Sequence, residues 1–505
     1  MKASDYRREY AAYHGAAGRA AYEHFSGRDA GPQLARARER FADLWTREVV
    51  ADLEREYDAA PAGFDTERAA LAALTNAARL GYAEARAREA TAELAACESA
   101  ARVEWDGERV GLDQALSLAA AESDARRRGE LVARRLDALR PCDDLRAARL
   151  DALADVAREL GFADFGALLA EATRADFARL SDAADALLEV TARGYAMHLS
   201  RWAANELPPA SPPRFADALR LARLPHLDQF FPARAARETH DAALAGLGIR
   251  IGRLTNLRVE ESPQSRPGEA RCFGVSPPED VRLASAPRAG ADFYLRFFQE
   301  AGRAQHLAWA SPELAARYPE FVHAPDTAVG EGFGFLFRHL FTDAAWLAER
   351  CGARASEAAE IARSCALAEL HDARRACALF HSQLELYGAG RSRSESLAAD
   401  YAARQGEATG FDTPAGLHLA DALGEGSRAA ELLRARLFAA SFAEHLRTRH
   451  GTRWWASRAA GDELIDVWNT ASRHTPEELA WLAAGVRFDP ELLAYQFSAA
   501  LGGGG

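Results

Sequence analysis

Apolar residues recur at intervals of three and four through most of this 505-residue chain. The pattern runs from about Ser4 to Ala203, in segments rich in Ala, Leu, Glu and Arg, and it returns after Gly290. Such spacing puts the apolar side chains on one face of an α-helix. Between about 248 and 286 it gives way to short alternating segments separated by Pro, Gly and Ser, which are typical of strands. The sequence therefore predicts a mainly α protein with a small sheet of about three strands.

A proline-rich stretch at 205–215, NELPPASPPRF, is the clearest candidate for a domain boundary. We therefore expect an N-terminal helical region over 1–210 and a second region over 211–505 that includes the sheet at 248–286, with lobes that are free to interleave. WDGER, residues 105–109, is predicted to form a turn between two helices.

The charge pattern limits the classes of partner. Charged residues make up 27% of the chain with both signs interspersed, and the formal net charge is -12. Because nucleic-acid binding usually needs a clustered basic excess, we expect no such partner. No apolar run approaches the length of about 18 residues that a membrane span needs, and the first residues lack the apolar core of a secretory signal. These features predict a cytoplasmic protein without a membrane segment; its oligomeric state is left open.

Six cysteines are spread along the chain without a C-x-x-C pair, which supports neither a zinc knuckle nor a redox motif. We expect all of them to be buried free thiols in a reducing compartment. They are Cys97, Cys142, Cys272, Cys351, Cys365 and Cys377.

The segment FFQEAGRAQH, residues 297–306, has the layout of a zinc-peptidase helix with other side chains at its metal-binding positions. An H-E-x-x-H helix carries two imidazoles one turn apart and a glutamate that activates a metal-bound water. Here Gln299 and Arg303 stand at the imidazole positions, and Glu300 stands at the position of the general base. At about 100° per residue, Gln299, Arg303 and His306 share one face. Taken alone, the segment also fits an ordinary core helix with a charged outer face.

A second predicted helix follows 25 to 30 residues later, in DTAVGEGFGFLFRHLF, and carries Glu331. Gly330, Gly332 and Gly334 beside it permit close approach to a neighbouring backbone, at some cost in helix propensity. In zinc peptidases whose third ligand is a glutamate, a second helix supplies that ligand at about this distance.

Together these segments resemble the thimet oligopeptidase and oligoendopeptidase F family of zinc metallopeptidases. The match to the family's metal helix consists of Phe298, Glu300, Gly302, Ala304 and His306. The resemblance implies a two-lobed helical fold around a central channel, with the sheet beside the former metal helix and a strand edge that pairs with a bound peptide. It also implies that Glu331 occupies the third ligand position. Arg428 and Leu432 then occupy the places of two tyrosines that stabilise the tetrahedral intermediate in the family.

These substitutions predict that zinc, the cofactor of active relatives, is not bound. A zinc site needs three protein ligands and an open position for water, and a protonated guanidinium cannot coordinate a metal. We expect Arg303 to replace the metal as a fixed cation paired with Glu331 and Glu300, so that neither carboxylate is buried alone. The chain is accordingly interpreted as an inactive homologue that binds peptides or a protein partner in the residual cleft.

Two alternatives stay open at this stage. The first is an active metalloendopeptidase with an altered ligand set drawn from His306, His323, Glu331 and His339. The second is a structural or regulatory subunit that partners an active relative and acts through its surface.

Overall fold

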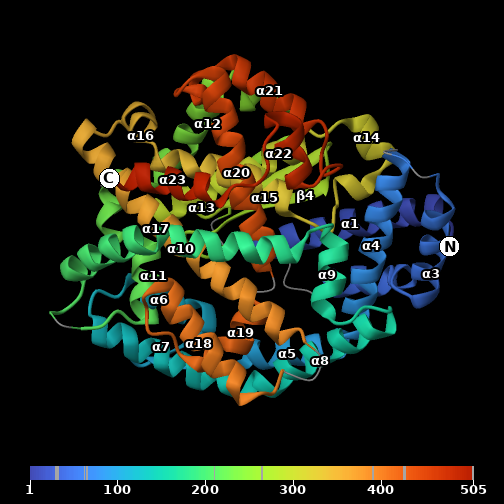
Figure 1. Ribbon diagram of the computed structural model, residues 1–505, viewed down its shortest axis with the longest axis horizontal. Helices are drawn as coiled ribbons and strands as arrows, with labels where there is room; N and C mark the ends of the chain where they lie inside the picture. Colours follow the sequence, from blue (N-terminus) through green and yellow to red (C-terminus); the bar gives the residue numbers. More distant parts are fainter. Residues whose placement is uncertain are drawn as a thin grey trace.

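Helices make up most of the computed structural model, which describes residues 1–28, 33–61, 63, 66–209, 211–262, 265–388, 392–424 and 428–502. Most of the N-terminal helices lie at the right and along the bottom of Figure 1, and the long α10 crosses its middle. They are α1 (Ala3–Phe25), α2 (Gln33–Arg40), α3 (Arg47–Ala59), α4 (Thr66–Arg86), α5 (Arg88–Ala100), α6 (Leu112–Ala121), α7 (Ala125–Leu139), α8 (Asp143–Glu159), α9 (Phe165–Thr173) and α10 (Phe177–Glu206).

In the second half of the chain, helices precede and follow a small sheet in the sequence. Its helices are α11 (Phe215–Arg223), α12 (Ala236–Gly246), α13 (Ala291–Ala308), α14 (Pro312–Arg317), α15 (Ala328–Arg338), α16 (Ala344–Arg350), α17 (Ala355–Leu386), α18 (Glu395–Thr409), α19 (His418–Leu423), α20 (Ala429–His450), α21 (Arg458–Trp468), α22 (Pro476–Ala484) and α23 (Pro490–Leu501). The predicted mainly α fold is confirmed. Helix α13 ends before Ser311 and Pro312, which cap and begin α14. None of the described helices could cross a membrane.

The three-stranded sheet lies in the predicted interval. Its strands are β3 (Leu257–Glu261), β4 (Ala270–Ser276) and β5 (Asp280–Ser285). The order is β3-β5-β4, with β5 parallel to β3 and antiparallel to β4, so β4 is an edge strand. Helix α1 crosses β4 closely: a Cβ on Gly18 would come within 2.6 Å of the Gly274 carbonyl oxygen. The first helix of the chain therefore covers part of the edge strand.

WDGER does not connect two helices, contrary to the sequence prediction. It forms the turn of an antiparallel hairpin between β1 (Arg102–Trp105) and β2 (Glu108–Gly111). Asp106 and Gly107 both have positive φ, at 48° and 83°, as a tight hairpin requires. Val103 and Trp105 are buried and alternate with charged residues. Such alternation is typical of a strand, and this was the signal that the sequence analysis missed.

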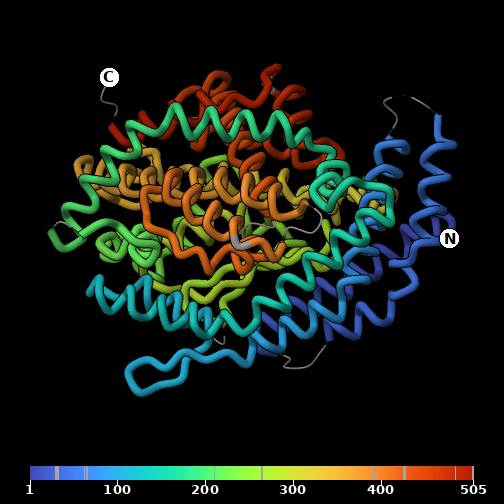
Figure 2. Tube along the Cα trace, turned by 60° about the horizontal axis from the view of Figure 1, so that its bottom comes forward, coloured from blue at the N-terminus to red at the C-terminus, as the bar shows by residue number. Residues whose placement is uncertain are grey.

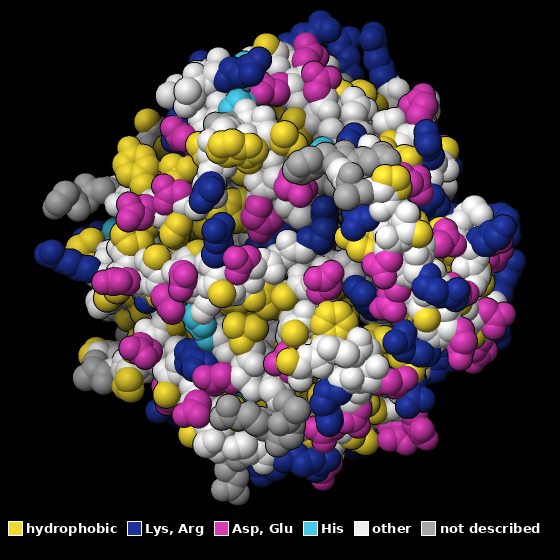
Figure 3. Space-filling model, turned by 45° about the vertical axis from the view of Figure 1, so that its right-hand side comes forward, with side chains coloured by type: hydrophobic (Ala, Val, Ile, Leu, Met, Phe, Trp, Pro, Cys, Tyr) yellow, Lys and Arg dark blue, Asp and Glu magenta, His cyan; other side chains and the backbone are white. Residues whose placement is uncertain are grey.

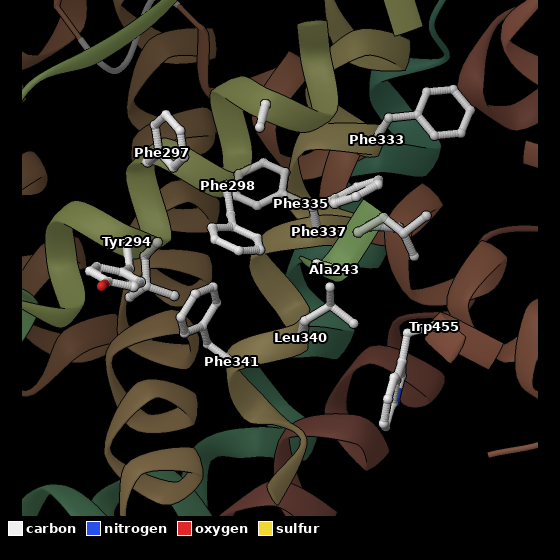
Figure 4. Close-up of a cluster of buried hydrophobic side chains, with 14 of the residues drawn as sticks. Ala243, Tyr294, Phe297, Phe298, Phe333, Phe335, Phe337, Leu340, Phe341 and Trp455 are labelled. Carbon is white, nitrogen blue, oxygen red and sulfur yellow. The ribbon is translucent and has the colours of Figure 1, made fainter. Parts of the chain in front are cut away.

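The central hydrophobic core joins the sheet to α13, α15 and α20. In Figure 4, Phe298 from α13 lies near Phe341, which follows α15, and their ring centroids are 4.9 Å apart. Other hydrophobic clusters cross residue 210, since α10 packs with α17 and α23, and helices of the first 170 residues pack with α17 to α19. The tube in Figure 2 shows the same crossing, with the long α10 running beside C-terminal segments. The division into 1–210 and 211–505 stays a prediction.

Two glycines let α13 and α15 touch backbone to backbone. A Cβ on Gly302 would lie 2.4 Å from the Phe333 carbonyl oxygen, and one on Gly334 would lie 2.8 Å from the Gln299 carbonyl oxygen. No larger residue fits either position without moving the helices apart. This contact fixes how the polar faces of the two helices meet.

The cysteines correct the expectation of six free thiols. Cys97, at the end of α5, and Cys142, in the 3₁₀ turn η2 (Arg140–Cys142), form a disulfide, and the other four are free. Their Cα atoms lie 6.0 Å apart although 45 residues separate them in sequence. Spacing could not reveal this pair, because the packing of α5 against η2 and α8 creates the proximity. The argument for a reducing compartment therefore does not apply to these two residues.

Thiol titration of the unfolded protein tests this pairing. Without reductant the denatured chain should react with about four equivalents of a thiol reagent, and with about six after reduction. The Cys97→Ser variant serves as control and should show one thiol more than the wild type without reductant. Six reactive thiols in the unreduced wild-type chain would contradict the disulfide.

The α13–α15 contact gives a second prediction. Gly302→Ala should lower the free energy of unfolding by about 1–3 kcal/mol, because its methyl group has no room beside Phe333. Gly194→Ala in α10 is the matched control: no atom lies within 4 Å of its added Cβ, so the better helix propensity should stabilise the protein by about 1 kcal/mol. Urea denaturation of both variants measures the difference. Equal shifts of the same sign would show that α13 and α15 are not in contact.

Candidate functional site

The polar faces of α13 and α15 meet around Glu331, which is 2% exposed. One carboxylate oxygen accepts a hydrogen bond from the Gln299 side-chain nitrogen at 2.9 Å, and the other accepts one from Arg428 Nη2 at 2.7 Å. Arg303 Nε lies 3.4 Å from that second oxygen. Burial by itself raises the pKa of Glu331, but the charges of Arg303 and Arg428 outweigh it and lower the pKa to about 2. Glu331 is therefore a buried carboxylate that is charged at neutral pH.

Glu300 lies one turn before Arg303 on α13 and accepts hydrogen bonds from its guanidinium group. Arg303 Nη1 is 3.0 and 2.8 Å from the two Glu300 oxygens, so one guanidinium nitrogen is shared by both. One of those oxygens also accepts the backbone N–H of Cys272, in the edge strand β4, at 2.7 Å. The carboxylate thus links the helix to the strand edge and occupies a main-chain donor that an added strand would need.

Arg303 is the common partner of both carboxylates, as the sequence predicts. Burial lowers its pKa, while the charges of Glu300 and Glu331 raise it more, so the guanidinium is protonated at every accessible pH. Its side chain keeps 24% exposure, which leaves one side of the ion pair open to solvent.

Both polar atoms of the Gln299 side chain form hydrogen bonds within the protein. Its side-chain nitrogen donates to Glu331, and its oxygen accepts from Arg338 Nη1 at 3.0 Å. Arg338 in turn pairs with Glu369 and with Asp372 on α17. Sequence reasoning missed Arg338, although it stands seven residues after Glu331 and hence on the same helix face. The oxygen of Gln299 is thus already used within the protein.

Arg428 and Leu432 are both on the C-terminal side of the site, at and near the start of α20. Arg428 precedes Ala429, the first residue of the helix, and hydrogen-bonds Glu331 and, at 3.0 Å, the Thr327 hydroxyl. Its side chain is 44% exposed. Leu432 is half-buried and packs against the central core. The stretch 425–427 that precedes Arg428 is outside the described residues.

The three histidines of the alternative metal set have different surroundings. His306 is buried and stacks on Phe333, and burial lowers its pKa to about 4. His323 stacks on His14 of α1, with ring centroids 4.7 Å apart. His339 follows α15 and faces Phe497 of α23. Within the described ranges, no three His, Cys, Asp or Glu side chains are placed to hold a metal ion.

The surface carries charges of both signs. In the view of Figure 3, Lys and Arg side chains are scattered among Asp and Glu, and they do not gather into one basic patch on this face.

Comparison with known proteins gives structural matches alone. Neither a scan against protein-family models nor a sequence search of curated proteins finds a match. An oligoendopeptidase F structure from Bacillus anthracis superposes with a TM-score of 0.63 at 12% identity, covering 93% of this chain and 85% of that chain. An M32 carboxypeptidase from Deinococcus radiodurans has a TM-score of 0.57 at 15% identity, covering 99% and 98%. A carboxypeptidase from Pyrococcus furiosus superposes with a TM-score of 0.59 at 14% identity, covering 99% of this chain and 97% of that chain. This chain has the helical fold of these peptidases.

Proposed function

We propose that this protein is an oligopeptidase-fold protein that has exchanged its metal for an arginine, and that it binds peptides without hydrolysing them. The observation that carries the proposal is the position of Arg303: its guanidinium donates to Glu300 and lies 3.4 Å from Glu331. A cation bound between these two carboxylates meets the electrostatic need that a metal ion would otherwise meet.

The side chains at the former metal positions do not fit zinc. Arg303 has no lone pair to offer, and the only metal-binding atom of Gln299 is its oxygen, which accepts a hydrogen bond from Arg338. Glu331 is the remaining candidate ligand, and each of its oxygens accepts a hydrogen bond from another side chain of the protein. One carboxylate beside a fixed positive charge falls short of the three ligands of a catalytic zinc site.

Hydrolysis is also disfavoured by the state of Glu300. Without a metal there is no Lewis acid and no metal-activated water. A positioned base alone contributes roughly 10² to 10⁴-fold. One oxygen of Glu300 accepts from Arg303, and the other accepts from both Arg303 and the Cys272 N–H. Neither Arg428 nor Leu432 supplies a phenolic hydroxyl to the intermediate.

Peptide binding is proposed for the open side of the ion-pair network. Arg303 and Arg428 are 24% and 44% exposed, so they offer positive charge toward solvent beside the buried Glu331. A peptide carboxylate suits such guanidinium groups. Binding by strand addition to β4 has less support, since Glu300 occupies the Cys272 N–H and α1 crosses at Gly274.

Removal of the internal cation gives a stability prediction. Arg303→Met should lower the free energy of unfolding by about 2–4 kcal/mol, because Glu300 and Glu331 lose a shared partner in a mostly buried site. Arg296→Met is the control: it lies on the same helix, pairs with Glu269 and is 52% exposed, so its effect should be small. Urea denaturation measures both variants. Equal losses would refute a special role for Arg303.

Metal content and peptide turnover test the function directly. After dialysis against zinc and removal of free metal, the wild-type protein should retain close to no zinc. The double variant Gln299→His, Arg303→His, which restores H-E-x-x-H, should retain about one equivalent. Adding Glu331→Gln to the double variant should release that zinc. About one zinc per wild-type chain would overturn the proposal and favour an active enzyme.

In the same preparations, a labelled peptide should bind the wild-type protein in fluorescence anisotropy and remain intact by mass spectrometry. Arg428→Ala should weaken this binding. Intact peptide without any binding would favour the partner-subunit alternative.

A further inference from the structure

A cleft of about 380 Å³ opens on the side of α15 away from Glu331. It lies between η7 (His339–Thr342), α16, α17, α20 and α23, near the C-terminus at the left of Figure 1. Its volume falls in the range of small-molecule sites, about 300–1,000 Å³. None of the residues assigned to peptide binding above lines it.

One part of the cleft lining is apolar. Leu336, Leu340 and Trp454 form buried surface at 1%, 4% and 5% exposure. The remaining apolar lining is alanine, contributed by four different helices: Ala344, Ala359, Ala362, Ala443, Ala499 and Ala500. Methyl groups leave open the space that larger aliphatic side chains would fill. An apolar body of a few carbon atoms to a phenyl ring therefore finds both room and contact.

Two guanidinium groups line the same cleft, and each is only partly used. Arg447 donates through Nη1 to Glu444 at 3.1 Å, and Arg363 through Nη1 to Glu360. Among the described residues, no further hydrogen bond is formed by the other nitrogens of either group. Since a guanidinium has five N–H donors, each can bind another anion.

The other polar lining groups do not compete for these arginines. His339 is neutral, because burial and then the charge of Arg447 lower its pKa to about 4. Asp343, the acidic residue of the lining, already accepts the backbone N–H groups of Ala345 and Trp346 and the indole N–H of Trp455. Gln496 donates through its side-chain nitrogen to the Ala440 carbonyl, and among the described residues its oxygen has no partner. The cleft thus offers two positively charged donor groups and one neutral acceptor.

We propose that this cleft binds a small organic monocarboxylate with an aryl or branched alkyl body, whose carboxylate pairs with Arg447 and whose body packs on Leu340 and Trp454. A monoanion fits better than a dianion, because Glu444 and Glu360 already neutralise part of the local positive charge. Apolar surface with a few placed polar groups is the usual composition of a ligand site.

Calorimetry with 3-phenylpropanoate and its uncharged analogue 3-phenylpropanamide tests the proposal on the full-length protein. The acid should bind saturably at about one equivalent and roughly tenfold or more tightly than the amide, since a charge-assisted hydrogen bond is lost in the amide. Arg447→Gln should remove this preference. Arg449→Gln is the control: it lies on the same helix, is 64% exposed, pairs with Glu463 and does not line the cleft.

A steric variant makes the location of binding testable. Ala359→Leu should lower the affinity for both ligands roughly tenfold, because the larger side chain fills the cleft. Ala499→Leu, at an exposed position of the lining, gives the same test if the first variant unfolds, and thermal melting identifies that case. No saturable binding up to 10 mM, equal affinity for acid and amide, or binding unchanged in the Arg447 and leucine variants would each overturn the proposal.

Discussion

The backbone contact between α13 and α15 is the constraint on which the rest of the site depends. Because Gly302 and Gly334 carry no Cβ, the helices approach until Gln299 and Arg303 reach Glu331 across the interface. Ridges of ordinary side chains would hold helix axes about 8–10 Å apart, and buried carboxylates would then be left without partners. The glycines lower helix propensity, and the core packing of the phenylalanines on the same helices offsets that loss.

Charge matching follows from this geometry. Buried ions are stable only when each has a partner and its hydrogen bonds are complete. Glu331 has Gln299, Arg303 and Arg428, while Glu300 has Arg303 and a main-chain N–H. The network extends through Arg338 to Glu369 on α17. A fold that elsewhere supports peptidases can therefore be held together at this point by side chains alone, and this is the basis on which we propose function without a metal.

Several elements were predictable because their signals are local. The helical periodicity, the small sheet, the cap at Ser311 and the face shared by Gln299 and Arg303 each follow from spacing within one segment. The pairing of Arg303 with Glu331 was expected from the resemblance to a peptidase helix and is present. The pairing of Arg303 with Glu300 was also expected and is present. Two further partners were missed, Arg338 for Gln299 and the Cys272 N–H for Glu300, because they come from other elements whose approach to α13 the sequence does not encode locally.

The sequence alone determined the helical character of this protein, the position of its sheet and the identity of the side chains on the face of α13. These depend on dihedral preferences and on apolar periodicity over a few turns. Only the tertiary structure decided that Cys97 meets Cys142, that α1 covers the edge of β4, and that a lined cleft forms behind α15. Such contacts join residues far apart in the chain, so they arise from the packing of whole elements and leave no periodic trace in the sequence.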